Sequence, residues 1–105
     1  MTEQMPGSMK ALPIVYEVPD DLGAQYATNL VIQHSNHEFV LSFFEIIPPV
    51  ILGSPEERVA QLKDVTAVRA RCLARIVVAA GRMQGFVEAM QENLSNYLAQ
   101  KGENE

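Results

Sequence analysis

The chain has 105 residues, a formal net charge of −5 and one cysteine. This length allows a single domain with one hydrophobic core. A hydrophobic fraction of 48% is close to that of soluble globular proteins, so the composition favours neither a fibrous nor a wholly disordered class. The negative charge repels phosphate backbones and anionic membranes, so we expect no nucleic-acid partner and no membrane partner.

Localisation is predicted from two features. No run of about 18 apolar residues is present, and the opening sequence MTEQMPGSMK lacks a basic region followed by an apolar one. Cys72 has no second cysteine with which to form an internal disulfide. A lone thiol fits a reducing compartment, and we therefore expect a cytoplasmic protein.

The N-terminal segment is predicted to be a flexible arm, residues 1–24. Its prolines interrupt any regular period, and its only apolar patch is 12–15. A single α+β domain is expected over 25–101, followed by a tail, 102–105. Alternatively, residues 14–16 of the arm add a strand to the edge of a sheet.

Two segments of β character follow, TNLVIQH and HEFVLSFFEII, with a polar break between them. If Ser35 and Asn36 form the turn, His34 lies opposite His37. If Asn36 and His37 form it, His34 lies opposite Phe39. Both registers align the apolar residues of the two strands on one face, whereas a shift by one residue mixes apolar with polar positions, so we predict a two-residue turn.

The second strand is predicted to be apolar on both faces. One face carries Val40, Phe44 and Ile46, and the other carries Phe39, Leu41 and Phe43. Such a strand must be covered on both sides. A helix of the same chain can cover one face, and the other needs the N-terminal arm or a second copy of the protein. This pattern predicts a homo-oligomer, a homodimer in the simplest case.

A short connecting helix is predicted after the proline pair at 48–49, which ends the strand. Ser54 is a suitable N-cap, Pro55 a suitable first helical residue, and Glu57 completes a capping box. We expect this helix to run to about residue 63.

The run VTAVRARCLARIVVA alternates between apolar and other residues, as expected for a half-buried strand. Strict alternation places Arg69, Arg71 and Arg75 on one face, where they could bind an anion. The favoured alternative is that these arginines pair with Glu38 and Glu45, or with carboxylates of a partner subunit. Cys72 falls on the apolar face and is expected to be a small buried residue.

The last segment has apolar residues at helical spacing from Met83 to Leu98. We predict an amphipathic helix from about Gly81 to Lys101, closed by Gly102. The expected fold is therefore α+β, a three-stranded antiparallel sheet in the order β-β-β-α, with one long C-terminal helix and a short connecting helix. A core this small gains stability when it is doubled in a dimer.

The motif HSNHEF raises the question of a metal site. If His34 and His37 are opposite each other, their Cβ atoms lie about 5 Å apart and could share a zinc ion. Glu38 points to the other face, and the sequence contains no further histidine. A polar hairpin tip is therefore favoured over a metal-assisted enzyme at His34 and His37. No nucleophile, base or cofactor motif is recognised, so we expect no cofactor and no enzymatic activity.

Between residues 26 and 97 the chain resembles a family of short prokaryotic proteins, the domain of unknown function 3467. The resemblance implies a β-rich fold with a helix and a bacterial or archaeal source, and it brings no established reaction. The chain departs from the family pattern at Ala79, Ala80 and Gln84, where a Ser-Pro pair and a lysine are common. The matching positions are Tyr26, Ala27, Asn29, Ser35, Glu38, Phe39, Pro48, Arg75, Val77, Val78, Asn93 and Tyr97.

These observations lead to one main functional hypothesis, a non-enzymatic homo-oligomeric interaction module. An adaptor that binds a peptide or client protein, at a sheet edge or in an apolar groove beside Phe44 and Ile46, is the alternative. The expected interaction surface comprises Val40, Phe44, Ile46, Arg69, Arg71 and Arg75.

Overall fold

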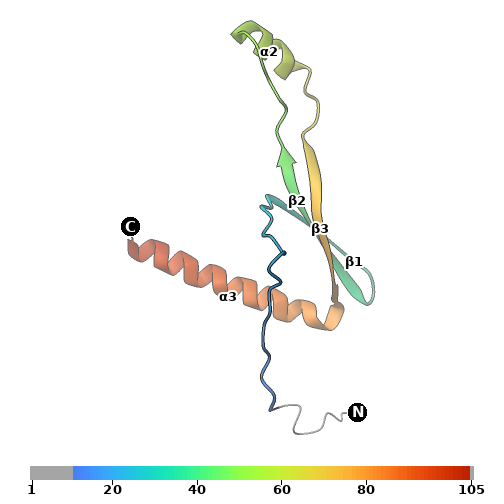
Figure 1. Cartoon of the computed structure of the whole chain (residues 1–105), viewed down its shortest axis with the longest axis vertical. Helices are drawn as coiled ribbons and strands as arrows, with labels where there is room; N and C mark the ends of the chain where they lie inside the picture. The colour runs from blue at the N-terminus through green and yellow to red at the C-terminus, as the bar shows by residue number, and fades with distance from the viewer. Residues whose placement is uncertain (1–10, 105) are drawn as a thin grey trace.

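The computed structural model describes residues 11–104 and contains a three-stranded antiparallel sheet of order β1-β2-β3 (Figure 1). The predicted α+β class is confirmed, and the connecting helix has the predicted bounds. The first ten residues of the predicted arm lie outside the described residues. The elements are β1 (Asn29–His34), β2 (Glu38–Ile47), α2 (Pro55–Lys63), β3 (Arg69–Ala79) and α3 (Ala80–Asn104).

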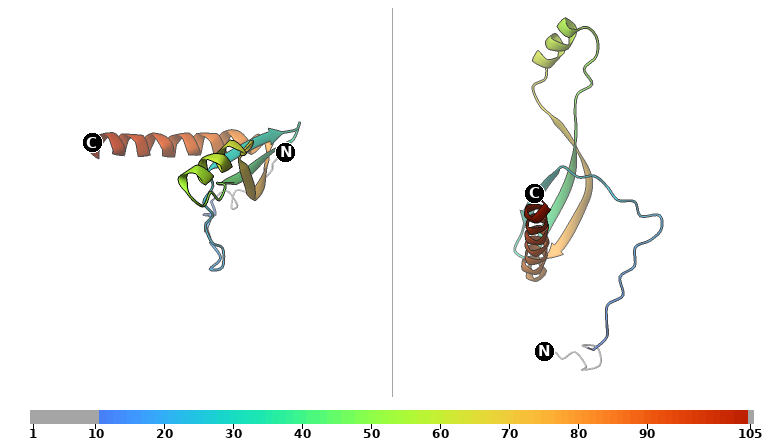
Figure 2. Two further views of the ribbon diagram at one scale, coloured as in Figure 1. Left: turned by 90° about the horizontal axis from the view of Figure 1, so that it is seen from above. Right: turned by 90° about the vertical axis from the view of Figure 1, so that its left-hand side faces the viewer.

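The chain does not fold into a compact body. Its Cα radius of gyration is 21.5 Å, whereas a compact domain of about 100 residues has about 13 Å. Three parts project from the sheet: the described residues of the N-terminal arm, the outer half of α3, and α2 on a stalk of two chain segments, 48–54 and 64–68 (Figures 1 and 2). Neither helix in the described range has the length and hydropathy needed to cross a bilayer.

The β1–β2 hairpin has a two-residue turn, as predicted. His34 pairs with Phe39, and the Ser35 N–H donates to the Glu38 carbonyl at 2.9 Å. Asn36 and His37 therefore form the turn, which is the second of the two registers considered. The backbone N–H of His37 donates to Ser35 Oγ at 3.4 Å.

A β-bulge interrupts the pairing of β2 with β3. Phe43 pairs with Ala74, but the next residue, Phe44, pairs with Cys72, which leaves Leu73 without an opposite residue. Because side chains alternate along a strand, one extra residue exchanges the faces of β3 on either side of Leu73. The strict alternation predicted for β3 is therefore wrong.

The sheet consequently has two distinct faces, which we call the helix face and the open face. The helix face packs against α3, and the core between them consists of Leu41 and Val78 of the sheet and Met83 of α3, with Phe39 and Phe43 partly buried. Only four described residues are buried, these three and Ser42. The helix face carries Leu30, Ile32, His34, Phe39, Leu41, Phe43, Ala74, Ile76 and Val78. The open face carries Val31, Val40, Ser42, Phe44, Ile46, Ala70, Cys72, Arg75 and Val77.

Helix α3 is longer than predicted. It begins at Ala80, directly after β3, and continues to Asn104. The prediction that Gly102 closes the helix is wrong. A glycine inside a helix costs only about 1 kcal/mol relative to alanine, and the helical residues on both sides of Gly102 offset that cost.

Candidate interaction surface

The open face is an apolar surface that the described chain leaves largely exposed. Val31, Ile46 and Val77 expose 48%, 41% and 58% of their surface. Val40, Phe44 and Ile46, predicted to share this face, do lie on it. A shallow hollow of about 280 Å³ on this face is lined by Asn29, Val31, Phe44, Ile46, Val68 and Ala70.

Cys72 shares the open face and is exposed, contrary to the expectation of a buried thiol. The strand pattern correctly identified an apolar side of β3 at this position. It could not show whether another layer covers that side, because the covering layer would come from a distant segment or another chain.

The helix face has its own unfilled apolar space. Beyond the small core, α3 diverges from the sheet and leaves an open hollow of about 440 Å³. Its walls come from β2, β3 and the first half of α3, so one helix alone does not seal this face. The lining residues are Leu41, Phe43, Ile76, Val78, Gly85, Phe86, Ala89 and Met90.

An apolar stripe follows α3 from Met83 to Leu98. Met83, Val87, Met90, Leu94 and Tyr97 recur at alternating intervals of four and three residues, which is the spacing of a helix that packs along another helix. Met83 is buried in the core, whereas the later members of this stripe expose about half of their surface, between 45% and 56%. Phe86 and Leu98 flank the stripe and are similarly exposed. We refer to these seven residues as the α3 stripe.

The three arginines of β3 do not share a face. Arg69 and Arg71 lie on the helix face, opposite Ile47 and Glu45, beyond the part that α3 contacts, whereas Arg75 lies on the open face. The predicted arginine stripe is therefore wrong, because the bulge at Leu73 separates its members. Arg71 pairs with Glu45, as the favoured alternative predicted, with Nη2 2.8 Å from Oε1.

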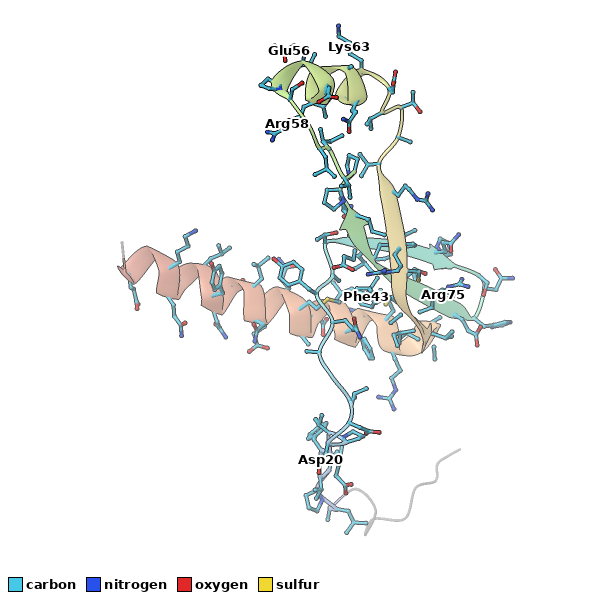
Figure 3. All side chains as sticks on the ribbon, turned by 45° about the horizontal axis from the view of Figure 1, so that its top comes forward. Asp20, Phe43, Glu56, Arg58, Lys63 and Arg75 are labelled. Atoms are coloured by element: carbon cyan, nitrogen blue, oxygen red, sulfur yellow. The ribbon has the colours of Figure 1, made fainter. Side chains whose placement is uncertain are left out.

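Arg75 binds a different group. Its Nε donates to Oγ of Ser42 at 3.3 Å, and Ser42 is 3% exposed. The arginine stem therefore covers a hydroxyl in the centre of the sheet. Figure 3 shows Arg75 and Phe43 at the sheet, far from the charged residues of α2.

The two histidines are not opposite each other. His37 is in the turn, and the ring of His34 lies against that of Phe39, with ring centroids 5.4 Å apart and the planes tilted by 39°. Among residues 11–104 no three His, Cys, Asp or Glu side chains are grouped so as to hold a metal ion. The hairpin geometry therefore gives no support to a metal-assisted reaction at this position.

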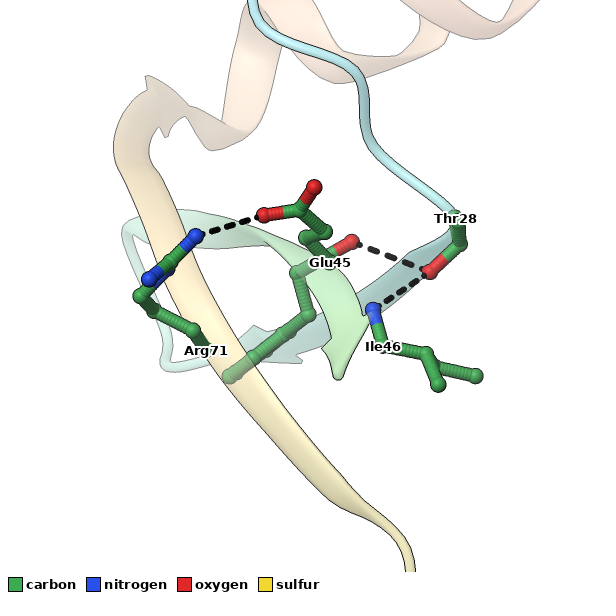
Figure 4. A network of polar contacts seen from close by, with 5 residues as sticks. Thr28, Glu45, Ile46 and Arg71 are labelled. Atoms are coloured by element: carbon green, nitrogen blue, oxygen red, sulfur yellow. Dashed lines mark hydrogen bonds and ion pairs between the residues drawn. The ribbon is translucent and has the colours of Figure 1, made fainter. Parts of the chain in front are cut away.

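Thr28 connects the arm to the sheet and was not identified from the sequence. Its N–H donates to the Phe44 carbonyl at 2.8 Å. Its Oγ1 accepts a hydrogen bond from the Ile46 N–H at 3.0 Å and lies 3.4 Å from the Phe44 carbonyl oxygen (Figure 4). Oγ1 also donates to Oδ1 of Asn29 at 2.9 Å. The place of Thr28 at the start of the predicted β segment TNLVIQH was the only signal, and a chain position alone does not show such anchoring.

Together these features define an α+β protein whose sheet and long helix present apolar surface that the described chain does not cover. The chain belongs to the family described as protein of unknown function (DUF3467), whose model matches residues 2–104. This match extends the resemblance beyond residues 26–97, toward the N-terminus and to the end of α3. No curated protein and no solved structure matches the chain.

Proposed function

We propose that this protein is a non-enzymatic module that self-associates through α3 and the helix face of its sheet. The observation that carries the proposal is the α3 stripe, six of whose seven members are about half exposed. Monomeric proteins rarely leave such a continuous apolar surface in water, because burying it is strongly favourable. A second copy offers an identical stripe and an identical hollow.

The proposed dimer places α3 of a second copy beside the first, over the helix face. Leu94 and Tyr97 of the second copy would fill the hollow next to Phe43 and Met90. A two-fold axis makes this contact reciprocal, so both hollows are filled at once. A stable interface buries roughly 800 Å² on each partner, so the proposed contact has to include the α3 stripe together with the apolar residues of the helix face.

Sedimentation velocity across the micromolar range tests the proposal. We expect the full chain to sediment as a dimer and Leu94→Glu to sediment as a monomer, because the carboxylate would be buried against apolar groups. Asn96→Glu is the matched control, since it adds the same charge on the side of α3 away from the stripe. A wild-type chain that remains monomeric throughout this range contradicts the proposal.

The open face supports a second candidate function, an adaptor that binds an extended peptide or client protein. Its hollow beside Phe44 and Ile46 is apolar, and self-association through α3 leaves it accessible. A dye that fluoresces on apolar surfaces separates the two functions. An adaptor binds the dye in its dimeric state and loses that binding in Phe44→Ser, whereas a fully sealed dimer binds little dye.

A further inference from the structure

The outer edge of β3 carries backbone groups available for a further strand. β3 is the last strand of the order β1-β2-β3, and no strand among residues 11–104 lies on its other side. The Ala80 N–H donates to the His37 carbonyl at 2.8 Å, in line with the β2–β3 register. Since backbone groups alternate in direction along an antiparallel strand, Arg75 and Val77 present their N–H and C=O groups to the free edge.

The N-terminal arm contains a five-residue segment suited to that edge. Residues 14–18, IVYEV, lie between Pro13 and Pro19 and are exposed. Ile14, Tyr16 and Val18 each expose more than 70% of their surface, and no other part of the described chain covers them. Both views in Figure 2 show the arm running away from its own sheet.

We infer that residues 14–18 of one copy form an antiparallel strand on the outer edge of β3 of a second copy, with Tyr16 opposite Ile76 and Glu17 opposite Arg75. This inference rests on the proposed self-association and specifies a further contact within it. In this register Tyr16 adjoins the helix face, where Ile76 is 48% exposed. Glu17 adjoins the open face and meets an arginine of opposite charge.

The neighbouring pairs support the same register. Val15 lies opposite Val77 and Ile14 opposite Val78, so apolar residues meet on both faces. A parallel strand with Tyr16 beside Ile76 would instead set Glu17 beside Val77 and Val15 beside Arg75. Cross-strand pairs of two apolar residues, or of two opposite charges, stabilise a sheet, whereas a charged residue opposite an apolar one does not. The antiparallel arrangement is therefore favoured.

The two prolines define the ends of the added strand. Val15 and Glu17 have backbone groups that can bond with those of Val77 and Arg75. The next residues of the arm in the same alternation are Pro13 and Pro19, and neither has an N–H to donate. Pro19 would also lie opposite the bulged residue Leu73, where the regular ladder of β3 ends.

The position of Thr28 favours a second copy over the same chain. Thr28 is bonded to Phe44 and Ile46 of β2 and leads directly into β1. β1 forms the edge of the sheet opposite β3, so the arm leaves from the far side. Exchange between two copies adds one strand to each sheet and covers residues 14–18 of both chains.

Reversal of one charge pair tests the inference in the full chain. Glu17→Arg and Arg75→Glu each set like charges opposite one another, and we expect each variant to dimerise about tenfold more weakly. An equimolar mixture should recover the wild-type dissociation constant, because every arm then meets the opposite charge on the other chain. Pairing within one chain gives no recovery, so absence of recovery between two folded variants counts against the inference, and absence of the cross-link described next as well overturns it. Asp21→Arg makes the same charge change outside the strand and should have no effect.

Cross-linking provides a second measurement, in case Arg75→Glu does not fold. A Tyr16→Cys chain and an Ile76→Cys chain, both carrying Cys72→Ser, are mixed and oxidised with diamide. A disulfide-linked heterodimer supports the inference, and Val77→Cys, whose thiol faces the other side, is the matched control. If the wild-type chain sediments as a dimer, but the mixed charge variants show no recovery and this cross-link does not form, the arm pairing is overturned. The proposed α3 interface is then unaffected. A monomeric wild-type chain overturns both.

Discussion

Arg71 and Glu45 form an ion pair across β2 and β3, with Nη2 2.8 Å from Oε1. The arginine side chain is 64% exposed, so water and salt screen the pair. We expect Arg71→Ala to lower the free energy of unfolding by less than about 1 kcal/mol, with a smaller loss at high salt. Urea titration at two salt concentrations measures both effects. Arg69→Ala, on the same face two residues earlier, controls for the loss of a surface arginine, and an equal effect of the two substitutions would show that the ion pair contributes nothing.

The stability of the first turn of α2 is predicted to depend on pH. Hydrogen bonds from the backbone N–H and the hydroxyl of Ser54 hold the pKa of Glu57 below its ordinary value, and the Ser54 N–H lies 2.7 Å from Oε1. A lowered pKa in the folded state means that the stabilisation is present above the ordinary pKa and is lost as pH falls through the folded value. The protection factors of the α2 amides, which already correct for the intrinsic exchange rate, should therefore show an additional decrease as pH falls through the folded pKa. Glu57→Gln should remove this additional dependence, and a variant that retains it would assign the effect to another carboxylate.

Gly53 allows the turn that leads into α2. Its φ is +108°, and a Cβ built on it would lie 2.5 Å from Oε1 of Glu57. Gly53→Ala is therefore expected to strain the backbone and displace the capping carboxylate, at a cost of about 1–3 kcal/mol to α2. Because the stalk lies far from α3, we expect loss of local protection in α2 with unchanged sedimentation. Gly23→Ala is a suitable control, since no atom lies within 4 Å of the added Cβ.

Local patterns in the sequence predicted most of the fold. The capping box of Ser54 and Glu57 fixed the start of α2, since both partners lie within one helical turn. The two-residue turn followed from the apolar residues of β1 and β2, because a one-residue shift would move every side chain to the other face. The sequence did not decide between the two registers of this turn, because both place the same apolar residues on one face. It therefore did not predict whether His37 lies in the turn or opposite His34.

The bulge at Leu73 could not be predicted, and it changed the interpretation of the candidate site. Bulges are often marked by glycine, and the run RARCLARIV contains none. The bulge allows β3 to direct Ile76 and Val78 toward α3 while Ala70 and Cys72 lie on the open face. Regular alternation instead placed all three arginines on one face, whereas the folded chain places Arg75 on the face opposite to Arg69 and Arg71. Whether an apolar face is covered depends on distant segments, which a local pattern does not report.

Gly102 gives a direct test of where α3 ends. Since α3 continues to Asn104, this glycine adopts helical geometry, and no atom lies within 4 Å of an added Cβ. Gly102→Ala is then expected to stabilise the protein by about 0.4–1 kcal/mol, because alanine has less conformational freedom to lose on folding. Thermal unfolding measures the change. A destabilised variant would indicate a left-handed cap at this position and a shorter helix.

The relation between Met83 and Phe86 separates the core of one chain from the proposed interface. Met83 is 8% exposed and packs with Leu41 and Val78, so Met83→Ala should cost about 2–5 kcal/mol at any protein concentration. Phe86 is 46% exposed in the described chain, and a monomer should therefore lose little in Phe86→Ala. In a dimer that buries the α3 stripe, the same substitution weakens association, so its cost is observed as a lower midpoint of denaturation that depends on protein concentration. Denaturation of both variants at two concentrations a hundredfold apart distinguishes these cases, and a Phe86→Ala midpoint that matches the wild type at both concentrations would place the phenylalanine outside any interface.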